Sequence, residues 1–536
     1  MMSDQSSSPS AIGVPAADPG STKPRSFSFV RVFLAVLLIA TSGVAGGFIA
    51  MRVSENRTDS SAPQWFAPYV DVTLTPTYEF QDPGTNDSLN VVLSFIVGSK
   101  NDGCSPSWGA TYSLDEADQQ LDLERRIVRQ RQRGGDVIVS FGGAINQELA
   151  VACTNLETLT AAYAEVVNHY DLSLIDLDLE GTTLANVTAN TRRAEALAAV
   201  QKARRDAGED LAIWLTLPVA PDGLDSEAVA TIDATLAGGV DLAGVNLLTM
   251  DYGSSRRSSV SFVDASTAAA DSAFEVLNRA YRRAGVSLTS AEVWQRIGMT
   301  PMIGQNDTIA DRLDIEGARA LHKWSRSRGV GRMSMWSANR DTACGGNILD
   351  TVVNNNCSGV DQEPGQFAAV LGASAIEIST ELATTAASPE QRGAQADPSE
   401  VASNDNLPYD EWRKRREYDI DEKVVWDGVV YEAKWWTVGD PPDAIVDHDW
   451  DSPWRVLGPV LDDEPPLPPP VTIPPNTFPT WNVESTYYAG DRVQLDGLGF
   501  KAKWWTRGDI PTAEPDNEWE NPWEPIDSAS IVVTSK

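Results

Sequence analysis

The chain has 536 residues, of which 42 are basic and 76 acidic, so its formal net charge is −34. This length accommodates two or more domains. A surface so acidic repels phosphate backbones, which excludes nucleic acid as an expected partner, whereas it tolerates a neutral polysaccharide and attracts one that carries free amines. Three histidines and four cysteines without metal-ligand spacing lead us to expect no metal cofactor.

The N-terminal part carries a candidate membrane segment. Residues 32–51 form a largely apolar run of about 20 residues, the length with which a helix crosses a bilayer, and three basic residues precede it. These charges predict that residues 1–31 stay in the cytoplasm and that a single-pass anchor leaves the rest at the cell surface. If the small residues at 42–46 are cleaved, the chain is secreted instead.

All four cysteines follow this segment, in the part that we expect to be exported, where disulfides form. Cys344 and Cys357 close a short local loop, so we expect them to pair. Cys104 and Cys153 then pair by elimination. The alternative is that the cysteines remain free and buried.

Short apolar runs alternate with longer amphipathic stretches from residue 65 to about 375, which is typical of repeated βα units. The expected strands are 66–73, 91–97, 137–143, 172–180, 211–218, 243–252, 297–303 and 331–338. Helical patterns lie between most of them, at 114–133, 156–170, 191–207, 268–284 and 315–328. Eight strands predict a (β/α)8 TIM barrel, with catalytic residues at the C-terminal ends of the strands. A doubly wound open sheet is the alternative, but no Gly-rich phosphate loop follows the first strand.

The fourth expected strand carries three acids within five residues. In an extended strand Asp176, Asp178 and Glu180 share one face, while the other face is apolar and can pack under a helix. Three neighbouring negative charges repel one another and should raise at least one pKa, which suits a proton donor near neutral pH. The alternative is a solvated face of an antiparallel sheet.

Three motifs of this region resemble those of family 18 glycoside hydrolases, the chitinase family. Residues 140–143 (SFGG) match its SxGG motif on the third strand, and residues 176–180 (DLDLE) match its DxDxE motif on the fourth. Residues 330–341 resemble its last strand, which carries a characteristic tryptophan. Upstream of the acids the family has Asp-Gly where this chain has Ser173-Leu174, which leaves the subfamily open.

The resemblance implies a role for each of these residues. Glu180 is the general acid and then the base, and Asp178 holds the acetamido N–H of a substrate whose own acetamido oxygen is the nucleophile. Asp176 shares a proton with Asp178, so that the acids titrate together. Ser140 hydrogen-bonds into the acid cluster, or is only a small residue in a tight place. Trp336 stacks against the sugar that is cleaved, or else belongs to the core.

The sixth expected strand departs from the family's MxYD motif, and two alignments are possible. One places Leu248, Met250 and Asp251 on the motif's Met, Tyr and Asp. The other places Met250 and Tyr252 on its Met and Tyr, with Gly253 in place of the Asp. Strand alternation puts Met250 and Tyr252 on one face, so we prefer Tyr252 as the site residue and keep Asp251 as the weaker candidate.

Beyond the barrel region, taken as 65–377, two similar segments follow two linkers. A linker at 378–408 precedes the first segment, 409–457, and a Pro-rich linker at 458–477 precedes the second, 478–526. Aromatic and acidic positions recur with an offset of 69 residues, as from Trp412 to Trp481. Two copies are too few for a solenoid, so we expect two independent β-rich modules.

Each module contains a pair of adjacent tryptophans, Trp435-Trp436 and Trp504-Trp505. Adjacent residues of a strand point to opposite faces, so one indole of each pair is expected to face solvent. The segment AKWWTxGD and the closing tryptophan resemble family 5/12 carbohydrate-binding modules, which are small chitin-binding domains. The resemblance implies that exposed indoles stack on sugar rings; the alternative is that both belong to the core.

Together these resemblances predict a retaining chitinase that cleaves β-1,4 bonds between N-acetylglucosamine units, endo-acting rather than exo-acting. Chitin and its oligosaccharides are the expected partners, and no protein partner is implied. One alternative is a chitin-binding adhesin with an impaired barrel. Another is an endo-β-N-acetylglucosaminidase, which shares the catalytic motif but gains nothing from two chitin modules.

Overall fold

The computed structural model describes residues 64–346, 352–373, 407–446, 451–461, 464–467, 472–512 and 520–526. The expected membrane segment at 32–51 and residues 1–31, which were expected to be cytoplasmic, lie outside these ranges, so both remain predictions. Within the described ranges, no helix combines the length and the apolar character that a membrane crossing requires.

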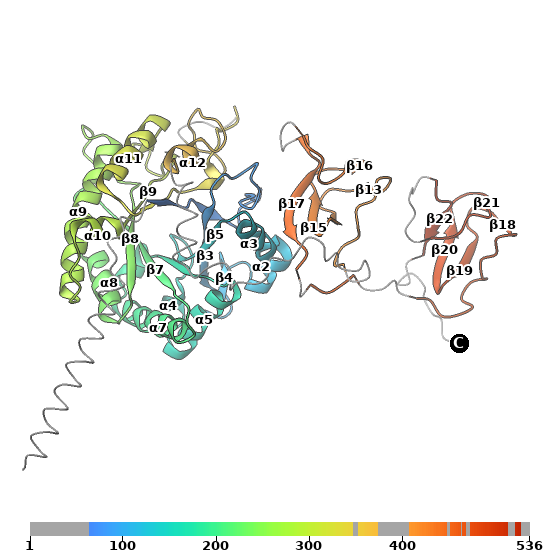
Figure 1. Cartoon of the computed structure of the whole chain (residues 1–536), viewed down its shortest axis with the longest axis horizontal. Coiled ribbons are helices and arrows are strands. Elements are labelled where there is room, and N and C mark those ends of the chain that lie inside the picture. Colours follow the sequence, from blue (N-terminus) through green and yellow to red (C-terminus); the bar gives the residue numbers. More distant parts are fainter. Residues whose placement is uncertain are drawn as a thin grey trace, which may run out of the picture. The chain divides into compact units, whose positions relative to one another are not determined.

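A closed barrel of eight parallel strands forms the larger part of the described structure (Figure 1). Its first strand is split into β1 (Trp65–Phe66) and β2 (Tyr69–Asp71), which pair with the last and second barrel strands. The others are β3 (Asn90–Gly98), β5 (Asp136–Gly142), β6 (Leu174–Asp178), β7 (Ala212–Pro218), β8 (Leu242–Leu248), β9 (Ile297–Thr300) and β12 (Arg332–Met333). The order β1-β12-β9-β8-β7-β6-β5-β3-β2 closes the sheet on itself, which confirms the predicted (β/α)8 barrel.

Helices surround this barrel in Figure 1. The longer ones are α2 (Leu114–Leu121), α3 (Leu123–Gln132), α5 (Leu156–His169), α7 (Val187–Asp206), α8 (Ser226–Ala237), α9 (Phe262–Arg283) and α11 (Ile315–Arg328). Short helices are α4 (Leu149–Ala152), α6 (Thr182–Ala185), α10 (Ser290–Gln295) and α12 (Gln366–Leu371). A single helix was expected at 114–133, but Asp122 adopts a left-handed φ of +49° and divides it into α2 and α3.

The sequence sets where several of these helices begin. At the residue before each helix, a side-chain oxygen accepts the backbone N–H three positions on, which satisfies a donor that the helix itself leaves unpaired. The residues that do so for α5, α8, α9 and α11 are Asn155, Asp225, Ser261 and Asp314.

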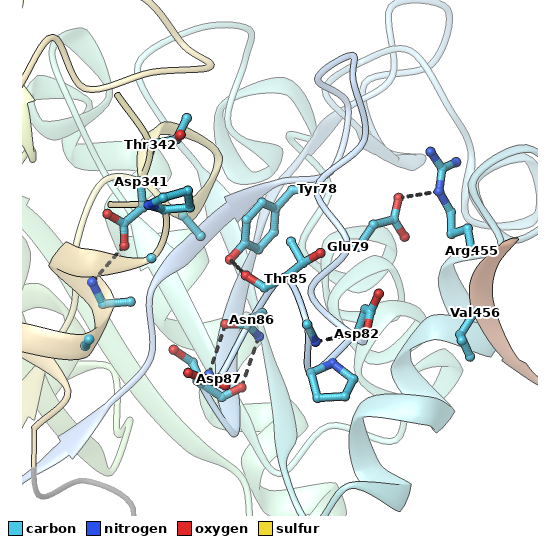
Figure 2. Close-up of a pocket in the computed structure, with 18 of the residues that line it drawn as sticks. Tyr78, Glu79, Asp82, Thr85, Asn86, Asp87, Asp341, Thr342, Arg455 and Val456 are labelled. Carbon is cyan, nitrogen blue, oxygen red and sulfur yellow. Dashed lines mark hydrogen bonds and ion pairs between the residues drawn. The ribbon is translucent and has the colours of Figure 1, made fainter. Parts of the chain in front are cut away.

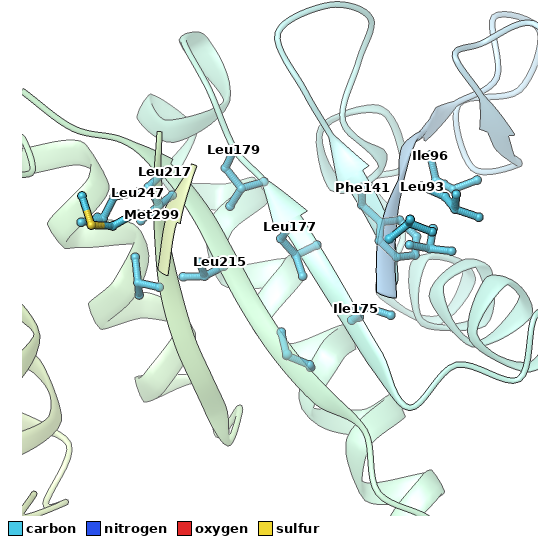
Figure 3. Close-up of a cluster of buried hydrophobic side chains, with 14 of the residues drawn as sticks. Leu93, Ile96, Phe141, Ile175, Leu177, Leu179, Leu215, Leu217, Leu247 and Met299 are labelled. Carbon is cyan, nitrogen blue, oxygen red and sulfur yellow. The ribbon is translucent and has the colours of Figure 1, made fainter. Parts of the chain in front are cut away.

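The apolar face of β6 packs outward, against the helices, as its alternation predicts. Ile175, Leu177 and Leu179 are fully buried and belong to the main core together with Leu215 of β7 and Leu247 of β8 (Figure 3). Burial of each such side chain contributes about 1.5–3 kcal/mol. This packing turns the acidic face of β6 into the barrel interior.

Additional short strands flank the barrel. β4 (Pro106–Trp108) pairs with β3 in the antiparallel sense, and β10 (Gly304–Gln305) pairs with β11 (Arg312–Leu313). Both expected disulfides are present and are confirmed: Cys104 is bonded to Cys153, and Cys344 to Cys357.

The two C-terminal segments share one strand arrangement. In the first, β14 (Lys423–Trp426), β15 (Val429–Ala433) and β17 (Trp454–Pro459) form one sheet, and β13 (Glu417–Tyr418) pairs with β16 (Thr437–Val438). In the second, β19 (Arg492–Leu495), β20 (Leu498–Ala502) and β22 (Trp523–Pro525) correspond to the first sheet, and β18 (Thr486–Tyr487) pairs with β21 (Thr506–Arg507).

Equivalent aromatic contacts hold the small cores of these modules. Tyr418 packs edge-on against Trp454 at 5.2 Å in the first, and Tyr487 packs against Trp523 at 5.1 Å in the second. Each of these indoles donates its N–H to the carbonyl oxygen of an aspartate 14 residues earlier, at 2.8 and 2.9 Å. The repeat read from the sequence is therefore also a repeat of contacts.

Candidate active site

Three acids of the fourth barrel strand lie at increasing height inside the barrel. Asp176 is fully buried, Asp178 at the end of β6 is nearly so, and Glu180, two residues beyond the strand, is half-buried. Because β6 runs toward the C-terminal mouth of the barrel, Glu180 is the acid nearest to solvent. The alternation of the sequence predicts this placement.

Asp176 accepts four hydrogen bonds. The hydroxyls of Tyr69 and Ser140 each donate to its Oδ2 at 2.8 Å. Its Oδ1 accepts from the Thr216 hydroxyl at 2.7 Å and from Arg332 Nη1 at 2.6 Å. The hydrogen bond expected of Ser140 is therefore present, and Asp176 also forms an ion pair with Arg332 that the sequence did not predict. The sharing of a proton between Asp176 and Asp178 stays a prediction.

Asp178 has a different environment. Its Oδ1 is buried and has no hydrogen-bond partner among the described residues. Burial raises its pKa well above the usual range, the charges of Glu180 and Asp176 raise it further, and Arg332 opposes them. A buried oxygen without a partner costs about 1–3 kcal/mol, which a donor group from a ligand would recover.

Glu180 has a pKa raised to about 7, first by burial and then by the charges of Asp251 and Asp307. A carboxyl that is half protonated near neutral pH can both give and take a proton there. It lines a pocket of about 310 Å³ together with Met250, Asp251 and Tyr252. The carboxyl therefore faces a space in which a ligand can reach it.

Two glycines bring β5 against the acid strand. Gly142 has φ +104°, and a Cβ there would lie 2.0 Å from the carbonyl oxygen of Asp178. Gly143 has φ +87°, donates its N–H to the same oxygen at 2.9 Å, and leaves no room for a Cβ beside the ring of Phe95. The SFGG motif thus holds the backbone of Asp178 in place.

Tyr252 was preferred because strand alternation was expected to continue through the sixth strand as far as this residue, but the strand ends before it. β8 ends at Leu248, and Asp251 has a left-handed φ of +51°. Tyr252 contributes to the pocket wall, but its hydroxyl lies 3.1 Å from that of Ser266 on α9. Asp251, the weaker candidate, lines the same pocket as Glu180 and is one of two aspartates whose charges raise the pKa of Glu180, which supports the alignment that begins at Leu248.

Trp336 is half-buried at the end of the eighth barrel strand. Its ring is stacked on that of Phe95, with centroids 5.5 Å apart and an angle of 20°, and lies 6.0 Å from Tyr69. Phe95 therefore fixes the orientation of the indole. No pattern in the sequence indicates this contact, because Phe95 belongs to the second barrel strand and meets Trp336 only in the folded barrel.

A larger hollow lies elsewhere and contains none of the three acids. It has a volume of about 1050 Å³ and is lined by residues that include Tyr78 and Asp341 (Figure 2). On one side Glu79 forms an ion pair with Arg455 at 3.0 Å. Its size alone would suggest a binding site, but the perturbed acids place the chemistry at the smaller pocket.

The paired tryptophans of both modules are exposed. Trp435 and Trp436 expose 42% and 53% of their surface, and Trp504 and Trp505 expose 41% and 60%. The prediction that only one indole of each pair faces solvent is wrong, because β15 and β20 end before the pairs and strand alternation does not apply to them. Each module thus presents two adjacent indoles to solvent.

No model of a known protein family matches the chain. Over 308 residues, or 56% of the chain, it is 32% identical to a protein of Escherichia coli (strain K12) described as a probable bifunctional chitinase/lysozyme. Over 302 residues, or 55% of the chain, it is 32% identical to Endochitinase 11 of Metarhizium anisopliae. The matches cover 34% and 56% of these relatives, so the chain spans about a third and about half of their length.

Among solved structures, the catalytic domain of a hyperthermophilic chitinase from Pyrococcus furiosus matches with a TM-score of 0.50 and 26% identity. The match covers 59% of this chain and 95% of that structure. This match supports the (β/α)8 fold of the described barrel. Mutants of active domain 2 of the Pyrococcus furiosus chitinase match equally well, at 25% identity.

Replacing Gly142 with alanine tests the close approach of β5 and β6 in this barrel. The new Cβ meets backbone at Asp178, so we expect a loss of about 2 kcal/mol or more in the free energy of unfolding and a large loss of any hydrolytic activity. Gly134→Ala is the matched control, since Gly134 has φ +83° but nothing within 4 Å of a Cβ. Urea unfolding measures both; equal losses would contradict a backbone clash.

Replacing Asp251 with asparagine tests the charge that acts on Glu180. The substitution removes a negative neighbour, so the pKa of Glu180 falls and its protonated form is lost at lower pH. The midpoint of the Glu180 carboxyl titration, followed by NMR and expected near pH 7 in the native protein, should move to lower pH. Asp307→Asn should move it less, and Asp233→Asn on α8 should leave it unchanged. An unmoved midpoint in Asp251→Asn would refute this coupling.

Proposed function

We propose that the chain is a chitinase that hydrolyses β-1,4 bonds between N-acetylglucosamine units, with Glu180 as general acid and base. The observation that carries the proposal is the unequal state of the three acids. Glu180 has a pKa of about 7, Asp178 has a buried oxygen without a partner, and Asp176 is bound in an ion pair. Such a site offers a proton donor and an acceptor for an N–H group.

The arrangement also argues for a substrate-assisted mechanism. Retaining hydrolases with an enzyme nucleophile need a second carboxylate that is free to attack the sugar. Both oxygens of Asp176 accept hydrogen bonds, and the buried Asp178 has a raised pKa, so neither is suited to that attack. A 2-acetamido group on the substrate supplies the missing nucleophile, which makes N-acetylglucosamine the sugar that fits.

The proposed reaction proceeds in two steps. Glu180 first protonates the glycosidic oxygen while the acetamido oxygen attacks C1, so the leaving sugar departs and an oxazolinium ion forms. Asp178 accepts the acetamido N–H, and its ionised form becomes favourable as positive charge develops beside it. The Glu180 carboxylate then takes a proton from water, which attacks C1 and opens the ring with retained configuration.

The comparisons and the modules support the finer assignment. Both curated relatives carry chitinase in their descriptions, and one is called an endochitinase, in line with endo action here. The two exposed tryptophan pairs can stack on the sugar rings of an insoluble polymer, and two modules raise affinity through effective concentration. We also propose that the barrel and modules lie outside the cell, anchored by residues 32–51 or released after cleavage; the two disulfides, which suit an oxidising compartment, support this proposal.

Glu180→Gln tests the assignment of the acid. Because the amide cannot give or take a proton, turnover of a defined N-acetylglucosamine hexamer should fall by roughly 10²–10⁴-fold or more. Binding to insoluble chitin, measured by sedimentation, should not change. Glu157→Gln, at the exposed start of α5, serves as control and should hydrolyse the hexamer normally. Full turnover by Glu180→Gln would refute the proposal.

Trp436→Ala combined with Trp505→Ala tests the modules. Loss of one indole from each module should weaken binding to insoluble chitin by about tenfold or more, because both arms of a bivalent contact are affected. Hydrolysis of the soluble hexamer should be unchanged. Ile445→Ala, at a fully exposed aliphatic residue of the first module, is the control. If hydrolysis of hexamer and polymer fell equally, the tryptophans would be structural instead.

A further inference from the structure

A buried guanidinium lies inside the barrel, at a residue that no sequence motif singled out. Arg332 opens β12, the eighth barrel strand, and its side chain has no exposure to solvent. Its Nη1 donates to Asp176 Oδ1 at 2.6 Å, and its Nη2 donates to the Tyr69 hydroxyl at 3.2 Å. Asp176 belongs to the fourth strand, so this ion pair crosses the barrel interior from strand eight to strand four.

Arg332 lies in an apolar, aromatic environment, which strengthens the electrostatic effect of its charge. The rings of Trp65, Tyr69 and Trp214 lie 5.2, 5.6 and 5.6 Å from the guanidinium carbon. Its Nε is buried and has no hydrogen-bond partner among the described residues. In such a medium an unpaired charge is costly and electrostatic interactions are strong, so Arg332 and Asp176 each depend on the other.

We propose that Arg332 is a positioning residue for the reaction at β6, which holds Asp176 as an ion-paired carboxylate and so confines the titrating proton to Asp178 and Glu180. This inference rests on the proposed function for its catalytic meaning. Arg332 touches no substrate; it acts through Asp176. The positive charge of Arg332 and the negative charge of Asp176 both lie deeper in the barrel than Asp178. Their effects on the pKa of Asp178 are therefore opposite.

The other groups that face Asp176 carry no compensating charge. Tyr69 on β2 has a pKa raised well above its usual value by burial and by the charge of Asp176, so it stays a neutral donor. Ser140 on β5 and Thr216 on β7 are neutral hydroxyls. Asn246 on β8, an amide, bonds to Thr216. On β6 itself the titrating neighbours are the two other acids, so Arg332 is the one cation in contact with Asp176 in the described part of the chain.

Arg332→Met and Asp176→Asn should shift the pH profile in opposite directions. Removal of the positive charge makes the acids hold their proton to higher pH, so the acid limb of kcat/KM for the hexamer moves up. Removal of the negative charge in Asp176→Asn leaves Arg332 unopposed. The acids then lose their proton at lower pH, so the acid limb moves to lower pH. The kcat/KM ratio between pH 5 and pH 8 should change roughly tenfold each way, the effect of one pH unit. The double variant should return close to the native profile.

A purely structural tie across the barrel predicts another outcome. All single variants would then lose activity and stability without opposite displacements of the acid limb, and that result would overturn the proposal. Arg332→Lys keeps the charge and should retain the native limb with a lower rate. If Arg332→Met does not fold, Asp176→Asn and the double variant decide, because replacing both members of a buried pair is better tolerated than replacing one.

A readout that needs no turnover separates this inference from the proposed function. In folded Arg332→Met, Asp178 and Glu180 keep a proton that they release in the unfolded chain, so their pKa is higher in the folded than in the unfolded state. That contribution to stability is present at low pH and is lost as pH rises. The deficit in unfolding free energy relative to the native protein should therefore grow from pH 5 to pH 8. A deficit independent of pH would overturn the proposal, even if the native protein hydrolysed no hexamer.

Discussion

The site depends on one constraint: three carboxylates follow one another on the same face of β6 and of the residues just beyond it, and two of them are buried. The apolar face of β6 packs under the helices, so the acidic face must turn into the closed barrel, where like charges cannot all stay ionised without compensation. The repulsion between the three acids is relieved in a different way at each depth in the barrel. Asp176 is paired, Asp178 is buried with a raised pKa, and Glu180 lies at the edge of the pocket.

Other features of the barrel serve this arrangement. Gly142 and Gly143 let the backbone of β5 reach the carbonyl of Asp178, and Phe95 holds the ring of Trp336. Burial raises the pKa of Glu180 toward neutrality, and the charges of Asp251, which follows the end of β8, and of Asp307 raise it further. The chemistry of the site therefore comes from several strands, although one short stretch of sequence carries its acids.

The sequence predicts the features that depend on local order. Alternation along a strand separates Asp176, Asp178 and Glu180 from Ile175 and its apolar neighbours, because the period of two residues is a property of the strand itself. The eight strands, the Cys344–Cys357 disulfide and the repeat of the modules follow from patterns and spacings of the same local kind, whereas the pairing of Cys104 with Cys153 followed only by elimination.

The sequence does not predict where strands end or what meets across the barrel. β8 stops at Leu248, which removed the reason for choosing Tyr252, and the strands of the modules stop before the paired tryptophans, which left both indoles exposed. Arg332 meets Asp176 only because the barrel closes, and no spacing in the sequence encodes that contact. Such contacts depend on the register in which distant strands pair, and this register cannot be predicted from a single sequence.

The most direct test of the account is the configuration of the first products. Proton NMR of the anomeric signals during hydrolysis of an N-acetylglucosamine hexamer distinguishes β from α products before they equilibrate. Substrate-assisted retention predicts that the β-anomer appears first and that the fully deacetylated hexamer, which lacks the acetamido nucleophile, is not cleaved. Initial α-anomer, or cleavage of the deacetylated hexamer at a similar rate, would contradict the account.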